Sequence, residues 1–190
     1  MRFNDKRGFT LIEVIVVAGI IAILAGILVP MIFNQIDEAK VTRALGDMKS
    51  IQSGIMIFKK DTGSWPDKTA PGVVGVTLLY SDSKSTATPP IPTNSGIDWN
   101  STTAERIADH LNANNDGVYG ATTWKGPYLN ANDADPWGNA YIINADNFST
   151  DGKVWVVSAG PDGIIQTNAA SDSCSDKAAG NGDDICIRLK

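Results

Sequence analysis

The sequence has few of the residues on which metal and acid–base sites depend. Its 190 residues include one histidine, His110, and two cysteines, Cys174 and Cys186. These three residues are few for a zinc site or a histidine-rich redox centre. The formal net charge of −5 argues against a broad basic surface, so we do not expect nucleic acid as a partner.

Common enzyme motifs are also absent. The sequence contains no G-x-S-x-G, no H-E-x-x-H and no P-loop. Any Ser-His or Cys-His pair would have to use His110, which lies in the polar stretch 108–115 without a partner motif. We therefore expect His110 to be exposed and without a role, and we expect no enzymatic activity.

The first 60 residues lack tryptophan and tyrosine, and this divides the chain in two. All five Trp, all four Tyr and eight of the nine Pro lie beyond residue 60. Residues 1–60 carry eight Lys or Arg against five acids, a net +3, whereas residues 61–190 carry eight against sixteen, a net −8. The first part is predicted to be helical, and the second to be a turn-rich globular head.

Residues 14–33 form a run of twenty positions without a charge. At about 1.5 Å per residue such a helix spans roughly 30 Å, the thickness of a bilayer core. Arg2, Lys6 and Arg7 precede the run, which places the N-terminus in the cytoplasm and the rest of the chain outside it. A secretory signal fits less well, because the run is too long and no small-x-small cleavage site follows.

An amphipathic pattern continues from this run towards residue 60. Apolar residues recur every three or four positions with charges between them, which predicts one buried stripe along a helix. The stripe comprises Ile32, Ile36, Val41, Leu45, Met48, Ile51, Ile55 and Phe58. The turn residues 61–63 end the helix near Lys60. A helix over 9–60 would be longer than a small head is wide, so its apolar half needs lipid or copies of itself as cover.

Two residues in the apolar half are unusual. Glu13 is a carboxylate near the helix start, where an unpaired charge in lipid costs several kcal/mol. Two explanations remain open: an acid at the membrane interface that the helix dipole favours, or a carboxylate that awaits a positive partner in an assembly. Pro30 lacks a main-chain N–H and predicts a kink or a locally melted turn.

Residues 6–13, Lys-Arg-Gly-Phe-Thr-Leu-Ile-Glu, resemble the class III signal of type IV pilins and type II secretion pseudopilins. The resemblance implies cleavage after Gly8 by a prepilin peptidase and N-methylation of Phe9. It also implies extraction from the inner membrane into a helical filament, in which Glu13 neutralises the terminal amine of a neighbouring Phe9. Pro30 falls where that family has its proline.

The same resemblance implies a domain organisation. Residues 1–8 are a leader peptide, 9–33 the transmembrane and polymerisation helix, 34–60 its amphipathic second half, and 61–190 the head with a C-terminal disulfide loop. The implied partners are further copies of the chain, the prepilin peptidase, inner-membrane assembly machinery, and minor pseudopilins or pilins. The chain would cross the inner membrane once, with an extracytoplasmic head, before entering a periplasmic or cell-surface filament.

Two sequence strings in the head make the resemblance specific to the major pseudopilins. Residues 124–129 (W-K-G-P-Y-L) and 135–141 (D-P-W-G-N-A-Y) are similar to strings of major pseudopilins. The implied function is a structural subunit of a periplasmic pseudopilus that acts as a piston in type II secretion. Two alternatives stay open: a type IV pilin of a surface pilus for adhesion, motility or DNA uptake, and a membrane-anchored binding module that never polymerises.

Residues 158–163 and 182–185 resemble the loop that holds a structural calcium ion in that family. The resemblance implies Ser158, Asp162 and Asp184 as ligands. Eighteen of the 21 acids are Asp, and turn chemistry alone also favours Asp, whereas calcium needs six to eight oxygen ligands. The segment 166–181 enlarges this loop beyond the family pattern.

The enlarged loop contains Cys174, twelve residues before Cys186. Export implies an oxidising compartment, in which two cysteines usually pair. We expect this disulfide to pin the C-terminus of the head. A C-terminal disulfide loop resembles type IV pilins more than major pseudopilins.

Short strand candidates separated by turn signals predict a small antiparallel sheet in the head. The candidates are 140–143, 153–157, 164–166 and 185–189. The first two flank a turn at 149–152 and form a hairpin. Residues 73–80 and 107–111 are ambiguous between strand and short helix, and 81–100 is expected to be a surface loop. A long helix packed on such a sheet is an α+β, pilin-like fold.

Overall fold

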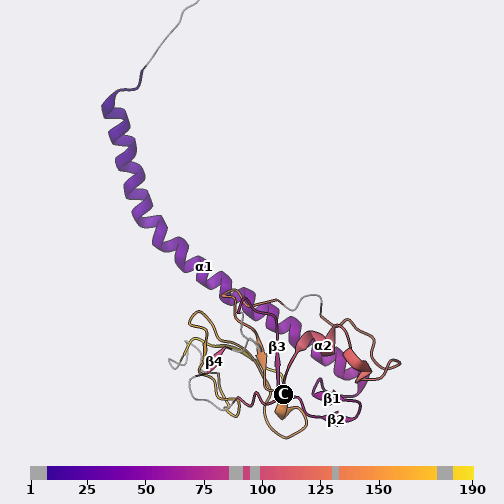
Figure 1. Cartoon of the computed structure of the whole chain (residues 1–190). Helices are drawn as coiled ribbons and strands as arrows, with labels where there is room; N and C mark the ends of the chain where they lie inside the picture. The colour runs from indigo at the N-terminus through magenta and orange to yellow at the C-terminus, as the bar shows by residue number, and fades with distance from the viewer. Residues whose placement is uncertain (1–7, 86–91, 95–98, 130–132, 175–181) are drawn as a thin grey trace, which may run out of the picture. The chain divides into compact units, whose positions relative to one another are not determined.

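The computed structural model describes residues 8–85, 92–94, 99–129, 133–174 and 182–190 (Figure 1). Apart from Gly8, the leader expected at 1–8 lies outside the described residues, as does the second half of the enlarged loop, 175–181. The chain divides into two compact units, residues 1–39 and residues 40–190.

The described part of the first unit is the beginning of helix α1 (Leu11–Thr62), which starts with a capping box. Glu13 N–H donates to Thr10 Oγ1 at 3.4 Å, and Thr10 N–H donates to Glu13 Oε2 at 2.8 Å. This reciprocal pair satisfies donors that a helix start leaves unpaired. The helix passes through Pro30 without interruption, so the alternative of a locally melted turn is wrong. A proline removes only its own hydrogen bond, and the flanking turns keep theirs.

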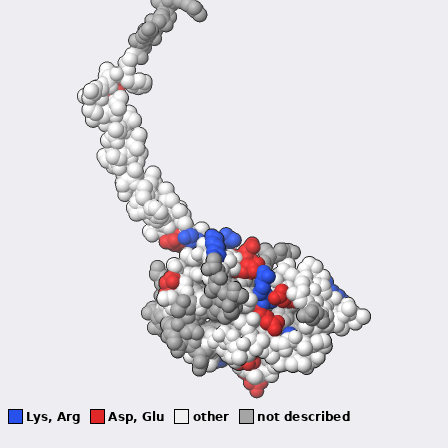
Figure 2. Space-filling view, viewed as in Figure 1, with Lys and Arg blue, Asp and Glu red and all other residues white. Residues whose placement is uncertain are grey.

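The first unit exposes its apolar side chains on every side of the helix. Each residue from 8 to 39 is exposed, and the large apolar side chains between Leu11 and Ile36 are 45–78% exposed. Figure 2 shows this segment as an almost unbroken surface without charged side chains. The helix is long and apolar enough to cross a membrane.

In the second unit, the remaining turns of α1 bury a stripe against the sheet. The buried residues are Ala44, Met48, Ile51, Gly54, Ile55 and Phe58. The predicted stripe is therefore correct only from Leu45 onward, because Ile32, Ile36 and Val41 are exposed. A 3.6-residue period marks one face of a helix but does not say how far along it a partner surface extends.

A five-stranded sheet with the order β5-β3-β6-β7-β9 forms the framework of the head. Its strands are β3 (Leu78–Tyr80), β5 (Ala104–Arg106), β6 (Ile142–Ile143), β7 (Trp155–Ser158) and β9 (Ile185–Arg188). The predicted hairpin is confirmed, since β6 and β7 are antiparallel with Ile143 opposite Val156. The fourth predicted strand is β9, which pairs antiparallel with β7 at the sheet edge. The sheet is mixed rather than purely antiparallel, because β3 and β5 run parallel.

The remaining elements are short. Strands β1 (Lys68–Ala70) and β2 (Val73–Val74) form an antiparallel pair, and β4 (Thr93–Asn94) and β8 (Ile164–Ile165) a parallel one. The third predicted strand, β8, thus pairs outside the main sheet, with a strand in the expected surface loop. Helix α2 (Ile107–Leu111) and strands β2 and β3 resolve the two ambiguous segments. Two 3-10 turns, η1 (Asn115–Gly117) and η2 (Ala145–Asn147), complete the described elements.

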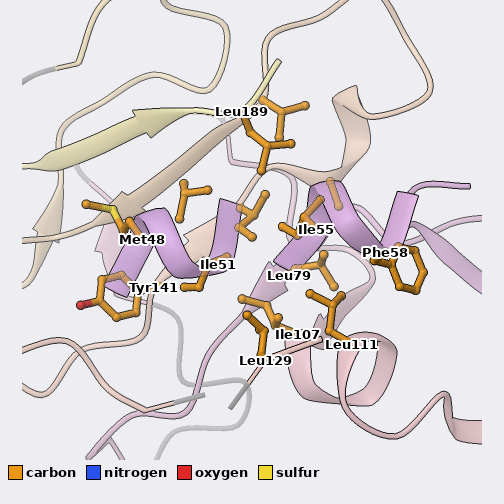
Figure 3. Packing of buried hydrophobic residues seen from close by; sticks show 14 of the residues in the cluster. Met48, Ile51, Ile55, Phe58, Leu79, Ile107, Leu111, Leu129, Tyr141 and Leu189 are labelled. Atoms are coloured by element: carbon orange, nitrogen blue, oxygen red, sulfur yellow. The ribbon is translucent and has the colours of Figure 1, made fainter. Parts of the chain in front are cut away.

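The two faces of the sheet bury separate apolar clusters. Alternate strand residues point to opposite faces, so Ile143 and Val156 join the α1 side whereas Ile142 and Val157 join the other. Figure 3 shows α1 side chains packed among residues of the sheet and of α2. A long helix against one sheet face is the predicted α+β, pilin-like architecture.

Candidate functional site

The start of α1 holds the residues predicted for processing and assembly. Gly8 is exposed, and Phe9 is 88% exposed. Glu13 Oε2 accepts hydrogen bonds from Thr10 N–H at 2.8 Å and from Thr10 Oγ1 at 2.7 Å. The carboxylate therefore acts as a helix cap within a single chain. Thr10 was missed by the sequence reasoning, although the spacing T-x-x-E is a recognised sign of a capping box.

Asp135, in the string D-P-W-G-N, organises a turn next to β7. Its Oδ1 accepts bonds of 2.8–3.0 Å from three main-chain N–H groups, those of Trp137, Gly138 and Asn139. Its Oδ2 accepts a bond of 2.7 Å from the Ser158 hydroxyl. Four donors satisfy this buried carboxylate, so the string is a carboxylate-capped turn that holds Ser158.

The predicted calcium loop is a glycine turn that lies against a pair of aspartates. Gly160 has φ of +63°, and a Cβ there would lie 2.4 Å from the carbonyl oxygen of Asp183, so glycine permits the close approach. Asp162 N–H donates to Asp183 Oδ2 at 3.3 Å. Asp184 Oδ2 accepts two main-chain bonds from residues 166–167, at 2.9 and 2.6 Å.

Two oxygens of this pair have no donor. Asp183 Oδ1 and Asp184 Oδ1 are buried without a hydrogen-bond partner among the described residues. Burial raises the pKa of both carboxyls, and nearby Asp162 raises the pKa of Asp183 further. Such oxygens suit a hard cation that binds carboxylates. In the described ranges, however, no group of three or more His, Cys, Asp or Glu could hold a metal. The side chains therefore offer part of a calcium shell, which main-chain carbonyls would have to complete.

Two of the three predicted calcium ligands, Asp162 and Asp184, accept hydrogen bonds from the same residue, Gln166. Gln166 Nε2 donates to Asp162 Oδ2 at 2.6 Å, and Gln166 N–H donates to Asp184 Oδ2 at 2.9 Å. Ser158 is fully buried, with its hydroxyl engaged in the neighbouring turn. Asp183 was missed as a candidate, although it directly precedes Asp184 in the sequence.

The expected disulfide joins Cys174 and Cys186, with their Cα atoms 5.9 Å apart. Cys186 lies in β9 opposite Val157 of β7, so strand pairing also holds the C-terminal strand. The disulfide therefore does more than pin a terminus. It ties the described part of the enlarged loop to the edge of the sheet.

His110 is buried, at 3% exposure, and the expectation of an exposed histidine is wrong. Its Nδ1 lies 2.7 Å from Tyr119 Oη, and its Nε2 lies 2.9 Å from Glu105 Oε2. The physical reason is helical spacing, because Ile107, His110 and Leu111 share one face of α2. That spacing was present in the sequence and was outweighed by the polar neighbours. The imidazole is thus buried in the core and bonded to Tyr119 through Nδ1, whereas Nε2 lies close to Glu105 but makes no well-aligned hydrogen bond with the described residues.

The comparisons with known proteins agree with this arrangement. Residues 3–29 match the prokaryotic N-terminal methylation motif, and residues 101–176 match the family described as type II secretion system (T2SS), protein G. The chain is 32% identical to the type II secretion system core protein G of Pseudomonas aeruginosa over 163 residues, which cover 86% of this chain and 89% of that protein. The core protein G of Escherichia coli K12 is 29% identical, over 88% and 90% of the two chains. That of Dickeya chrysanthemi is 28% identical, over 93% and 90%. No solved structure matches the chain with significance.

An apolar N-terminal helix that continues into the core of a small α+β head, behind a methylation motif, defines a pilin-like protein. The chain belongs to the type II secretion system core protein G family. It is accordingly a pseudopilin of type II secretion, a structural protein and not an enzyme.

Proposed function

We propose that the chain is made as a precursor that a prepilin peptidase cuts after Gly8 and that is then N-methylated at Phe9. Residues 9–33 anchor the product in the inner membrane, 34–60 continue the helix, and 61–190 form an extracytoplasmic head. The match to the N-terminal methylation motif supports this processing. The basic residues before the apolar run support the orientation.

The mature chains assemble into a filament through their apolar helices. One observation carries this proposal: the apolar side chains between Leu11 and Ile36 are exposed around the whole helix. Burial of apolar surface stabilises by about 25 cal/mol per Å². Once the segment leaves lipid, identical helices offer that burial, and a bundle of copies forms the filament core. Inside it, Glu13 pairs with the terminal amine of a neighbouring Phe9, since a buried charge without a partner is costly.

Growth of this filament acts as a piston on proteins that are to be exported. Inner-membrane assembly machinery adds subunits, and minor pseudopilins complete the structure. The core protein G relatives of the chain, which belong to type II secretion by name, support this assignment.

A structural calcium ion belongs to the same proposal. Asp162, Asp184 and the additional Asp183 would hold it, while Ser158 supports the turn beside them. The two donorless oxygens favour this assignment. When bound, the ion would neutralise the acidic pair and fix the turn between β7 and β8 against β9.

Imaging of sheared surface material from cells that overproduce the chain tests polymerisation. We expect filaments that an antibody against the head labels along their length. Unlabelled filaments, or none, would contradict polymerisation and leave a membrane-anchored module. Deletion of the gene tests the role in secretion: release of exported proteins should fall, and unchanged release would contradict that role.

A further inference from the structure

The sequence contains two Asn-x-Ser/Thr tripeptides, Asn100-Ser101-Thr102 and Asn147-Phe148-Ser149. This tripeptide is the acceptor for N-linked glycans on exported proteins, where it must lie on the surface. The structure gives the asparagine and the hydroxyl of each tripeptide different hydrogen-bond partners, and this difference carries the inference.

The first tripeptide lies at an exposed turn just before β5. Asn100 and Ser101 are exposed. Asn100 Oδ1 accepts hydrogen bonds from Thr102 Oγ1 at 2.8 Å and from Thr102 N–H at 3.2 Å. The acceptor side chain and the hydroxyl of its tripeptide are thus already in contact. The local Asx turn holds Oδ1 against Thr102.

The side-chain amide nitrogen of Asn100 carries two hydrogens, one of which a sugar can replace. Its Nδ2 donates to Asp146 Oδ2 at 3.0 Å, and both residues are exposed. An N-glycosylated asparagine keeps one N–H, so attachment of a sugar is compatible with this bond. Next to Asn100 lies a polar hollow of about 320 Å³ that Thr77, Asp146 and Asn168 also line. Amide, hydroxyl and carboxylate groups of this kind hydrogen-bond well to sugar hydroxyls.

The second tripeptide provides an internal comparison. Asn147 is half-buried, and its Nδ2 donates to the carbonyl of Lys153 at 2.9 Å. The Ser149 hydroxyl donates to buried Asp67 instead of to the asparagine. Phe148, the middle residue, is 1% exposed. Phe148 thus anchors this tripeptide in the core, and both polar side chains are bonded to other residues, although Ser149 is exposed and Asn147 also lines the polar hollow.

We infer that Asn100 is an N-glycosylation site and that the first sugar lies over the adjacent polar hollow. The donor is a lipid-diphosphate-linked sugar. Asn100 Nδ2 forms a bond to the anomeric carbon as the bond from that carbon to the diphosphate oxygen breaks. The lipid diphosphate leaves, and one amide proton passes to solvent. The inference rests on the extracytoplasmic placement of the head.

Tryptic cleavage after Lys84, Arg106, Lys125 and Lys153 separates the two tripeptides into peptides 85–106 and 126–153. The full chain is purified from its native cells and digested for mass spectrometry. We expect a glycan mass on peptide 85–106 and none on peptide 126–153. The variants Asn100→Gln and Thr102→Val should lose the glycan, and Thr102→Ser should keep it. Ser149→Ala should leave the glycan mass on peptide 85–106 unchanged.

The redox state of the cysteines distinguishes failure of the inference from failure of export. An oxidised Cys174–Cys186 pair reports that the head has left the cytoplasm. If the pair is oxidised and peptide 85–106 has only its unmodified mass, the inference is wrong while the proposed function stands. A glycan that persists in Asn100→Gln, or that lies on peptide 126–153, would equally overturn the assignment. Reduced cysteines in native cells would contradict the proposed export itself and, with it, the glycosylation.

Discussion

The backbone of Gly54 in α1 lies directly against Leu129: a Cβ at position 54 would stand 2.6 Å from Leu129 Cδ2 and 2.9 Å from the carbonyl oxygen of Tyr128. The main-chain oxygen cannot move aside as a side chain can. We expect Gly54→Ala to lower the free energy of unfolding by roughly 1–3 kcal/mol, the usual cost of overpacking. Urea denaturation of the full chain in detergent measures the effect.

Gly46 is the matched control, because it lies in the same helix and, beyond the backbone of its own helix, a Cβ at this position would have no atom of the described residues within 4 Å. Gly46→Ala should stabilise by roughly 0.5–1 kcal/mol through helix propensity. Equal effects of the two substitutions would show that the contact with Leu129 does not constrain position 54.

Thr10 and Glu13 separate capping from charge pairing. Glu13→Gln keeps an oxygen that can accept from Thr10 N–H but removes the charge, whereas Thr10→Ala removes the hydroxyl and keeps the carboxylate. If pairing with a neighbouring Phe9 amine drives assembly, Glu13→Gln should reduce filament yield far more than Thr10→Ala. The filament yield from sheared cells, normalised to the amount of membrane-inserted subunit, measures this difference. A larger loss for Thr10→Ala would point to the cap instead.

Gly8 governs processing in the proposed function. Substitution of Gly8 by valine should leave a precursor that retains the leader and an unmethylated Phe9, which gel mobility and N-terminal sequencing detect. Gly19→Val is the comparison, since Gly19 is an exposed helical glycine beyond the processing site. A product of mature size from the Gly8 variant would refute cleavage after this residue.

His110 should make the head sensitive to acid. Burial lowers the pKa of His110 from 6.5 to about 4, so between these values the unfolded chain binds a proton that the folded chain does not. This contribution to stability is complete above about pH 6.5 and falls by about 3 kcal/mol in total as the pH drops through about 4. Of the charged groups among the described residues, Glu105 lies against the imidazole, and Lys68 and Asp67 lie near its partner Tyr119.

Urea midpoints of the full chain in detergent at about pH 7.5 and about pH 4.5 test this dependence. The control is His110→Gln, which cannot titrate in this range and can still hydrogen-bond to Tyr119. The wild-type chain should lose more stability than this variant on acidification. The same loss in both chains would exclude His110 as the origin.

Calcium should raise the melting temperature of the chain, and a chelator should lower it, if the acidic pair holds the ion. Asp184→Asn should abolish this difference, because its carboxylate is buried and one of its oxygens has no donor among the residues that the structure describes. Asp172→Asn is the matched control, since Asp172 is exposed and pairs with Lys153. If chelator leaves the melting temperature of the wild-type chain unchanged, the acidic pair is not a calcium site.

The sequence predicted those structural elements that depend on contacts between residues close together in the chain. The β6–β7 hairpin follows from two neighbouring apolar runs, and the extent of α1 from its continuous period. The parallel pairing of β3 with β5 was not predictable in this way, because it joins residues 78–80 to 104–106 across a crossover. Likewise, the buried stripe begins at Ala44 because a tertiary partner, rather than the helix period, decides burial.

The candidate sites show the same limit. The disulfide and the N-terminal motif could be identified from residue type and spacing. The donorless oxygen of Asp183 and the bond between Ser158 and Asp135 depend on how separate turns meet. The inward orientation of His110 was within reach, since Ile107 and Leu111 mark the buried face of α2.

Gln52 of α1 donates a hydrogen bond to the carbonyl of Arg188 in β9, 136 positions later, and Leu189 joins the same cluster as Met48. The packed head is therefore complete only when the last strand is in place, although its central helix is synthesised first. Contacts so distant in sequence form slowly. A chain that crosses the membrane from its N-terminal side would expose an incomplete head until residues 185–189 emerge. During that interval, the exposed apolar surface and the unpaired edge of β7 would make the chain prone to aggregation.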